Sequence, residues 1–185
     1  KCTQYGSNQA YKFAKYLSAQ NICIISGLAL GIDTQAHIGA MKEIGRTIAV
    51  LGGGFSEIYP KENIKLYEEI LKNDGCIISE YAPTIKPDTL NFPKRNRIIA
   101  GLAMGTIVVE AAHRSGSTIT AKLSKIYGKP IFCIPSSIEN KKGVGTNRLI
   151  QQGANLITKP KDILKNLKIE EINSLVKETK EEIDS

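Results

Sequence analysis

The sequence has no tryptophan, and it is poor in the residues that build metal sites, with two histidines and four cysteines. His37 and His113 are far apart, and no two cysteines stand at the close spacing of a structural metal site. We therefore predict that the protein binds no metal. The cysteines are Cys2, Cys23, Cys76 and Cys133. The last three lie in apolar runs, which predicts small buried side chains in a reducing compartment.

Long apolar runs are also missing. None approaches the roughly 20 residues that a membrane-spanning helix needs, and no stretch has the pattern of a signal peptide. With 42% hydrophobic residues among 185 positions, the chain has enough apolar surface for one sizeable core. These features predict a cytoplasmic protein that has no membrane partner.

The common signatures of nucleotide enzymes are absent. No G-x-G-x-x-G opens a helix and no G-x-x-x-x-G-K-[S/T] occurs, so neither a dinucleotide cofactor nor P-loop phosphotransfer is indicated. The carboxylates near predicted strand ends, which have no partner at a motif spacing, are Asp33, Glu57, Glu80 and Glu110. We expect Glu110 to end a strand rather than to act as a base. The sequence thus predicts no catalytic residue, no cofactor and no enzymatic reaction.

Positive charge, in contrast, is in excess. The chain has 25 lysine and arginine residues against 18 aspartates and glutamates, a formal net charge of +7. Residues 168–185 contain six acids and three lysines, so residues 1–167 carry a net charge of +10. A basic body of this kind indicates an anionic partner. We predict a domain over residues 1–167 and a charged tail over residues 168–185, which is either a short amphipathic helix or a linker.

Short β-branched runs alternate with longer amphipathic segments. The predicted strands span residues 22–26, 47–51, 76–79, 106–110, 130–134 and 154–158. The predicted helices span residues 8–20, 32–44, 61–73, 93–103, 118–127, 146–152 and 161–167. This alternation is typical of a Rossmann-like, doubly wound α/β fold with a mostly parallel sheet and helices on both faces. Because a helix comes before any strand, we expect the first strand of the sheet to be missing from the sequence.

Three predicted strands end in loops of small residues, at the edge of the sheet where α/β proteins bind ligands. The first loop contains Gly27, the second is Gly52 to Gly54, and the third contains Ser115, Gly116, Ser117 and Thr118. Small residues at such turns let backbone N–H groups approach an anion, and the dipole of the following helix favours it. The alternative for the third loop is that a hydroxyl merely caps the helix. Together the loops predict phosphate binding.

The segment NFPKRNRIIAGLA, residues 91–103, places three cations near the start of a predicted helix. Pro93 suits the first helical position. Lys94, Arg95 and Arg97 are therefore predicted in the first turn, where the dipole disfavours each by roughly 0.3–1 kcal/mol. A bound phosphate removes that cost, and Phe92 is suited to stacking on a base. Two alternatives stay open, since Phe92 could pack on the helix as a hydrophobic staple and Arg97 could pair with a nearby carboxylate.

Six motifs carry a family resemblance. They are SGLALGIDTQAH, AVLGGG followed by YP, FPKRNRIIAGLA, VVEAAHRSGSTITA, GKPIFCIP and GTNRLIQQGA, and their order and spacing match from about Tyr5 to Leu167. The chain resembles the DNA-processing protein A family, also called DprA or Smf. The resemblance implies a Rossmann-like domain that binds and protects single-stranded DNA, forms a homodimer and helps load the RecA recombinase in natural transformation. It implies no catalytic reaction.

The resemblance also implies a DNA site. By position, DNA or its phosphates would contact Phe92, Lys94, Arg95, Asn96, Arg97, Ser115, Gly116, Ser117 and Thr118, with Gly27, Gly53 and Gly54 close by. The sequence departs from the family pattern at two places. The family's Gly-Ser/Thr-Arg motif would fall just before Lys1, and Ser136 stands where the family usually has glycine after the Ile-Pro pair.

Two other functions stay open at this point. The related cytokinin-activating phosphoribohydrolases share this type of sheet but use a P-G-G-x-G-T-x-x-E loop, whereas HRSGSTIT here has Thr120 in that region and no glutamate. A sensor of small nucleotides would use the same phosphate loops without needing a single strand. Competition between oligonucleotides and mononucleotides separates the sensor from a DNA-binding protein.

Overall fold

The structure is a computed structural model that describes residues 2–112 and 115–169. Its helices are α1 (Gln4–Ala19), α2 (Ile32–Ala40), α3 (Ile64–Lys72), α4 (Asn91–Leu102), α5 (Gly116–Ile126), α6 (Val144–Gln151) and α7 (Lys161–Asn166), and a 3-10 turn, η1 (Lys61–Asn63), leads into α3. Its strands are β1 (Ile24–Ser26), β2 (Thr47–Val50), β3 (Cys76–Ile78), β4 (Thr106–Val108), β5 (Ile131–Cys133) and β6 (Asn155–Leu156). Each predicted strand and helix corresponds to one of these elements, in the predicted order.

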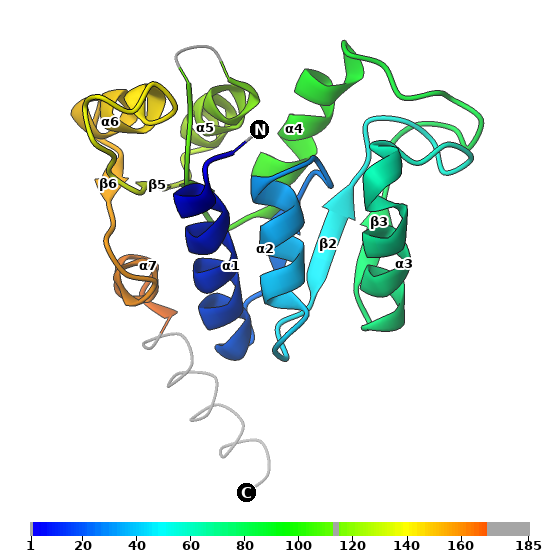
Figure 1. The fold of residues 1–185 in the computed structure, drawn as a ribbon, viewed down its shortest axis with the longest axis horizontal. Coiled ribbons are helices and arrows are strands. Elements are labelled where there is room, and N and C mark those ends of the chain that lie inside the picture. Colours follow the sequence, from blue (N-terminus) through cyan, green and yellow to red (C-terminus); the bar gives the residue numbers. More distant parts are fainter. Residues whose placement is uncertain (1, 113–114, 170–185) are drawn as a thin grey trace, which may run out of the picture.

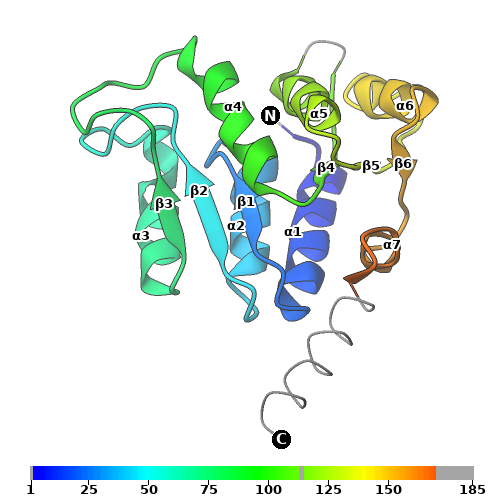
Figure 2. The ribbon, with the colours of Figure 1, turned by 180° about the vertical axis from the view of Figure 1, so that it is seen from behind.

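All strand pairs are parallel, as predicted, but they form two sheets of three strands instead of one. The first sheet has the order β1-β2-β3 and the second has the order β4-β5-β6. In the first, Ile25 lies opposite Ile48, and in the second Ile107 lies opposite Phe132. Among the described residues no backbone pairing joins β1 to β4, and these two strands form the inner edges of the two halves (Figure 2).

Helices cover both faces of the strands, which confirms the predicted α/β class. Figure 1 shows α1, α2 and α3 on the near face, and Figure 2 shows α4 and α5 on the opposite one. Helix α1 packs against α2, and α4 packs against α5, β1 and β2. Phe13 and Leu17 of α1 share a core with Phe132 of β5 and Ile163 of α7. This core ties the second sheet to α1.

Helix α1 begins where its sequence provides a cap. The Thr3 hydroxyl accepts a hydrogen bond from the Gly6 N–H over 2.9 Å, which satisfies one of the first free backbone donors. From there Ala10, Phe13 and Leu17 recur at helical spacing and are buried. The Glu110 carboxylate, just beyond β4, accepts the Thr3 N–H over 2.9 Å and also the Thr3 hydroxyl. The start of α1 is thereby fixed to the carboxyl end of β4.

The predicted start of α4 is wrong by two residues. The helix begins at Asn91, so Pro93 is its third residue, Lys94 belongs to the first turn, and Arg95 and Arg97 lie in the second. A turn at Asp88 starts the helix early, because its carboxylate accepts the Leu90 N–H over 2.7 Å. Proline is tolerated at the third position because the first N–H groups of a helix have no intrahelical partner. The dipole cost assigned to Arg95 and Arg97 therefore does not apply.

The burial prediction holds for one of the three cysteines in apolar runs. Cys133 in β5 is buried, and burial raises its pKa to about 12. Cys23 and Cys76 are exposed. Cys23 directly precedes β1 and Cys76 is the first residue of β3, so both lie at the amino ends of strands. An apolar run predicts a strand, but it does not predict whether helices cover the strand up to its amino end, where these two cysteines lie.

Three further predictions concern a membrane span, a metal site and the tail. Among residues 2–112 and 115–169, no helix is both long and apolar enough to cross a bilayer. Within the same ranges, no group of histidine, cysteine, aspartate and glutamate side chains has the arrangement of a metal site. The tail predicted as a helix or a linker lies outside the described residues from position 170 on, and so does His113.

Candidate functional site

The loop between β1 and α2 is held by the Asp33 carboxylate. Asp33 Oδ2 accepts the N–H of Gly27 over 3.0 Å and that of Ala29 over 3.3 Å. Leu28 between them is fully buried at a φ of 59°, a conformation that costs a branched residue energy. Asn63 holds it there by donating to the Leu28 carbonyl over 2.8 Å. The Gly27 N–H, predicted to face an anion, is therefore already bonded to a protein carboxylate.

Arg95 joins the carboxyl ends of β1 and β2. Its Nη1 donates to the Gly27 carbonyl over 2.9 Å and also to the Val50 carbonyl, and its Nε donates to Asn96 Oδ1 over 3.1 Å. The residue is only 5% exposed. Burial lowers the pKa of Arg95, and the negative charge of Asp33 opposes that shift. Arg95 therefore acts as an internal support of the site rather than as an exposed phosphate ligand.

An aromatic pair lies beside this support. The rings of Tyr59 and Phe92 stack with centroids 5.6 Å apart, and the Arg95 guanidinium lies 5.9 Å from the Phe92 centroid. Phe92 is half-buried and Tyr59 is exposed. A Cβ at Gly52 would lie 2.5 Å from Phe92 Cδ1, so glycine there lets the ring approach the backbone. The hydrophobic-staple alternative for Phe92 did not foresee this stack with Tyr59. Of the two rings, that of Tyr59 is exposed to solvent.

The two exposed cations of α4 differ in their surroundings. Lys94 makes no hydrogen bond or ion pair with any residue that the structure describes. Arg97 forms an ion pair with Glu80, which follows β3. Both partners of that pair reach solvent, so its net stabilisation is small, about 0–1 kcal/mol. The ion-pair alternative for Arg97 is thus observed, and it leaves the cation at the surface.

The glycines that follow β2 are covered by protein. Gly52, Gly53 and Gly54 are buried. The Gly54 N–H donates to the Ile85 carbonyl over 2.7 Å, and Ser79 Oγ donates to the Gly53 carbonyl over 2.7 Å. A Cβ at Gly53 would lie 2.7 Å from the Pro87 nitrogen. These glycines let the chain between β3 and α4 lie on the loop, so Gly53 and Gly54 are in contact with protein where phosphate was predicted.

The third predicted loop is the most open of the three. Ser115 and Ser117 share a hydrogen bond between their hydroxyls over 2.7 Å, and Thr118 Oγ1 donates to the Ser115 carbonyl over 2.7 Å. The Ser115 hydroxyl makes no capping bond to the backbone of α5. Asn96 Nδ2 lies 3.5 Å from the Gly116 carbonyl, which links this helix start to α4. The described geometry therefore does not support the simple capping alternative at Ser115.

The site contains residues that sequence reasoning did not assign. Asp33 was noted only as an unpaired carboxylate, yet it shapes the Gly27 loop. Tyr59 has no role in the site predicted from the sequence, and it forms half of the aromatic pair. Glu80 is the partner of Arg97. The only signal for Asp33 was its place in the first turn of α2, directly after a glycine loop.

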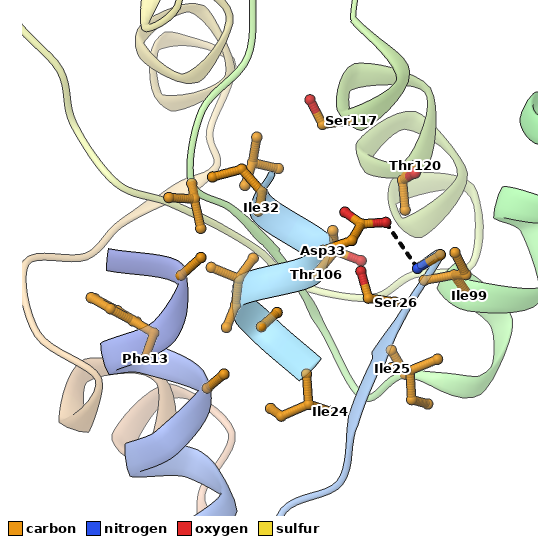
Figure 3. A pocket seen from close by; sticks show the side chains of 18 of the residues that line it. Phe13, Ile24, Ile25, Ser26, Ile32, Asp33, Ile99, Thr106, Ser117 and Thr120 are labelled. Atoms are coloured by element: carbon orange, nitrogen blue, oxygen red, sulfur yellow. Dashed lines mark hydrogen bonds between the residues drawn. The ribbon is translucent and has the colours of Figure 1, made fainter. Parts of the chain in front are cut away.

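A cavity of about 1440 Å³ lies between β1 and β4, beneath the carboxyl ends of the strands. Its apolar lining includes Phe13, Ile24, Ile25, Ile32 and Ile99, and its polar end includes Asp33, Ser117 and Thr120 (Figure 3). The volume is above the roughly 300–1,000 Å³ of common small-molecule pockets. The cavity runs along the edges of β1 and β4, which pair with no other strand among the described residues.

Comparisons with known proteins bear on the family. Residues 1–168 match the family model described as DNA recombination-mediator protein A. Protein Smf of Escherichia coli is 43% identical over 163 residues, which are 88% of this chain and 44% of that protein. DNA processing protein DprA of Streptococcus pneumoniae is 44% identical over 163 residues, 88% of this chain and 57% of that protein. The chain thus spans about half the length of these curated relatives.

A solved structure agrees with these matches. DNA processing protein A of Helicobacter pylori, described for its single-stranded DNA binding mode, superposes with a TM-score of 0.83 and 32% identity. The match covers 92% of this chain and 77% of the other. The family model, the relatives and the shared fold confirm the resemblance carried by the six motifs, and the chain belongs to the DNA recombination-mediator protein A (DprA/Smf) family.

Proposed function

We propose that this chain binds single-stranded DNA at the carboxyl ends of its strands. The observation that carries the proposal is the stacked pair of Tyr59 and Phe92, whose helix α4 also carries the exposed Lys94, a cation without a partner among the described residues. The exposed ring of Tyr59 offers a stacking surface to any base, and an exposed cation on the same helix as Phe92 can neutralise phosphate. The Helicobacter pylori relative, which is described for its single-stranded DNA binding mode, supports single-stranded DNA as the ligand.

The proposal gives the predicted site residues different roles. Phe92, Lys94 and Arg97 contact DNA directly, and Arg97 exchanges the Glu80 carboxylate for a phosphate. Ser115, Gly116, Ser117 and Thr118 offer hydroxyl groups and the N-terminus of α5 to a second phosphate. Arg95 and Asn96 are buried, and together with Gly27, Gly53 and Gly54 they hold the loops in place.

The proposal includes no chemical reaction. Two carboxylates near the strand ends are engaged with backbone groups, Asp33 with Gly27 and Glu110 with Thr3. We further propose that the chain acts in the cytoplasm as a homodimer that protects incoming DNA and helps load the RecA recombinase. The family's description as a recombination mediator supports this role.

Fluorescence anisotropy tests the binding proposal. A labelled oligothymidylate is titrated with the protein, and unlabelled single strand, duplex or thymidine monophosphate is added as a competitor. We expect competition from the single strand alone, and log K should fall by about 0.7 per phosphate contact for each log unit of salt. Lys94→Ala should weaken binding, while Lys72→Ala, which removes an exposed lysine from the last turn of α3, should not. Equal competition by the monophosphate would favour a nucleotide sensor.

A separate assay tests the absence of catalysis. The protein is incubated with nucleoside monophosphates, and the products are separated by chromatography. We expect no free base. Base release that scales with protein concentration and disappears in Glu110→Gln would show a phosphoribohydrolase and contradict the proposal.

A further inference from the structure

Helix α5 directs its large apolar side chains away from the core. The residues that it buries are the small Ala121 and Ser124, which have no exposed surface. In contrast, Ile119 is 37% exposed, Ile126 is 75% exposed, and Tyr127 at the end of the helix is 43% exposed. A surface helix normally places its large apolar residues on the face that packs against the protein. The outer face of α5 therefore has the character of an interface.

The inner face of α5 has room only for small residues. Ala121 belongs to a core with Val108 of β4 and Cys133 of β5. The hydroxyl oxygens of Ser124 and Thr106 lie 2.6 Å apart, so the helix lies close to β4. Larger side chains on this face would force the helix away from the strands. The exposed apolar residues are thus additional to the core.

The outer apolar residues of α5 form one stripe along the helix. They stand at positions i, i+4, i+7 and i+8 and are Ile119, Leu123, Ile126 and Tyr127. This is the spacing with which one helix packs against another. Helix α5 lies beside α4 (Figure 2), and a Cβ at Gly101 of α4 would lie 3.9 Å from Tyr127 Cε2. The stripe therefore runs to the edge of α4 and fits one face of a second helix.

The charges beside this stripe have one sign. Between Asp88 and Glu139 the sequence contains a single acid, Glu110, whose carboxylate is bound to the start of α1. Lys122 and Lys125 stand three residues apart on the side of α5 that adjoins the stripe. Both are exposed, and neither makes a hydrogen bond or an ion pair with any residue that the structure describes. The surface is therefore complementary to an acidic partner.

We propose that the outer face of α5 binds an acidic amphipathic helix of a partner protein. The apolar side chains of that helix cover Ile119 and Ile126, and its acidic side chains pair with Lys122 and Lys125. The inference does not depend on the proposed DNA site, because the stripe begins at Ile119, beyond the residues of α5 that are assigned to DNA.

Two other occupants fit this face less well. A second copy of the chain would bring Lys122 and Lys125 against the same residues of its partner, and like charges at an interface are unfavourable. Single-stranded DNA would suit the lysines, but its bases stack on aromatic side chains. Ile119 and Ile126 are aliphatic, so Tyr127 alone could serve that purpose.

Two synthetic peptides test the proposal by fluorescence anisotropy with the whole chain. Both are labelled helices of about 18 residues with leucine at heptad positions a and d, and the flanking positions carry glutamate in one and lysine in the other. We expect only the glutamate peptide to bind. Ile126→Gln should weaken binding about tenfold, and the double variant Lys122→Gln/Lys125→Gln about three- to tenfold at low salt. Leu71→Gln, which changes an exposed leucine of α3, is the matched control and should have no effect.

Several results would overturn the proposal. Binding of neither peptide, or equal binding of both, would show that the face does not select an acidic helix. Unchanged affinity in Ile126→Gln would place the peptide elsewhere, and a dimer that this variant dissociates would assign the face to a second copy. Displacement of the peptide by oligothymidylate, with weaker DNA binding in Ile126→Gln, would assign the face to DNA. Tighter peptide binding in the double variant Glu181→Gln/Glu182→Gln would assign it to the chain's own acidic residues 168–185.

Discussion

The Arg95 guanidinium lies beneath the first glycine loop, where its Nη1 donates to the Gly27 carbonyl over 2.9 Å. The same nitrogen also donates to the Val50 carbonyl, so one side chain of α4 joins the ends of β1 and β2. Its neighbour Lys94 points to solvent without a described partner. Two adjacent cations of one motif therefore differ in their surroundings, since Arg95 is hydrogen-bonded inside the fold and Lys94 is exposed.

Arg95→Met should lower the free energy of unfolding by about 3 kcal/mol, because it leaves the Gly27 and Val50 carbonyls without their charged donor. Lys94→Met serves as the matched control and should change stability by less than about 0.5 kcal/mol. Urea denaturation of both variants measures the difference. If Arg95→Met unfolds at the wild-type urea concentration, the supporting role is wrong.

For the exposed ion pair of Arg97 and Glu80 we predict changes in DNA affinity with little change in stability. Glu80→Gln removes the carboxylate that competes with phosphate for Arg97, so it should tighten single-stranded DNA binding several-fold at low salt. Arg97→Ala should weaken binding, and both variants should keep the stability within about 1 kcal/mol. Anisotropy titrations and melting curves on the same samples provide the two measurements. A large fall in melting temperature for Arg97→Ala with unchanged affinity would make the ion pair structural.

The order of strands and helices could be predicted because apolar periodicity and turn residues are local signals. The inward position of Arg95 also has a local signal that was not used. Arg95 and Asn96 stand four residues before Ile99 and Ala100, so they share the face of α4 that packs on the strands. The same spacing sets Arg97, which stands four residues before the exposed Gly101, apart from Arg95, whereas Lys94 stands four residues before Ile98 and is not distinguished by it.

Other parts of the site depend on residues far apart in the chain. Tyr59 meets Phe92, and Glu80 meets Arg97, only after β2 and β3 place their following loops beside α4. The burial of Gly53 and Gly54 likewise depends on the later segment that folds over them. A glycine loop has the same sequence pattern whether a phosphate or another part of the chain approaches its backbone. The sequence alone therefore predicted that the site lies at the carboxyl ends of the strands, but it could not predict which of the three loops is exposed to solvent.

Gly52→Ala tests the aromatic pair without removing either ring. The added Cβ would lie 2.5 Å from Phe92 Cδ1, so the ring has to move and its stack with Tyr59 is disturbed. Because stacking contributes about 1–3 kcal/mol per base, DNA affinity should fall about fivefold or more. Gly101→Ala is the control, since its Cβ meets only Tyr127 at 3.9 Å. If both variants lost affinity, or if neither did, the position of the Phe92 ring would not be what determines DNA binding.

His37 predicts how stability depends on pH. It is fully buried, and its Nδ1 lies 2.7 Å from Thr47 Oγ1, which donates to the Ile24 carbonyl over 2.7 Å. Nδ1 is therefore the protonated nitrogen, and Nε2 has no hydrogen-bond partner among the described residues. Burial lowers the pKa of His37 to about 4, the charge of Asp33 opposes that shift, and the charge of Arg95 adds to it.

The sign of the effect follows from where the proton binds. The unfolded chain takes up a proton on this histidine near pH 6.5, whereas the folded chain does so only near pH 4. The stability from His37 is thus fully present above pH 6.5 and is lost as the pH falls towards 4, by at most about 3 kcal/mol. Urea unfolding at a series of pH values should show this loss in the wild type and a flatter profile in His37→Gln. Parallel profiles for the two proteins would mean that other groups, such as Asp162, whose pKa is lowered by the Thr158 N–H, cause the acid sensitivity.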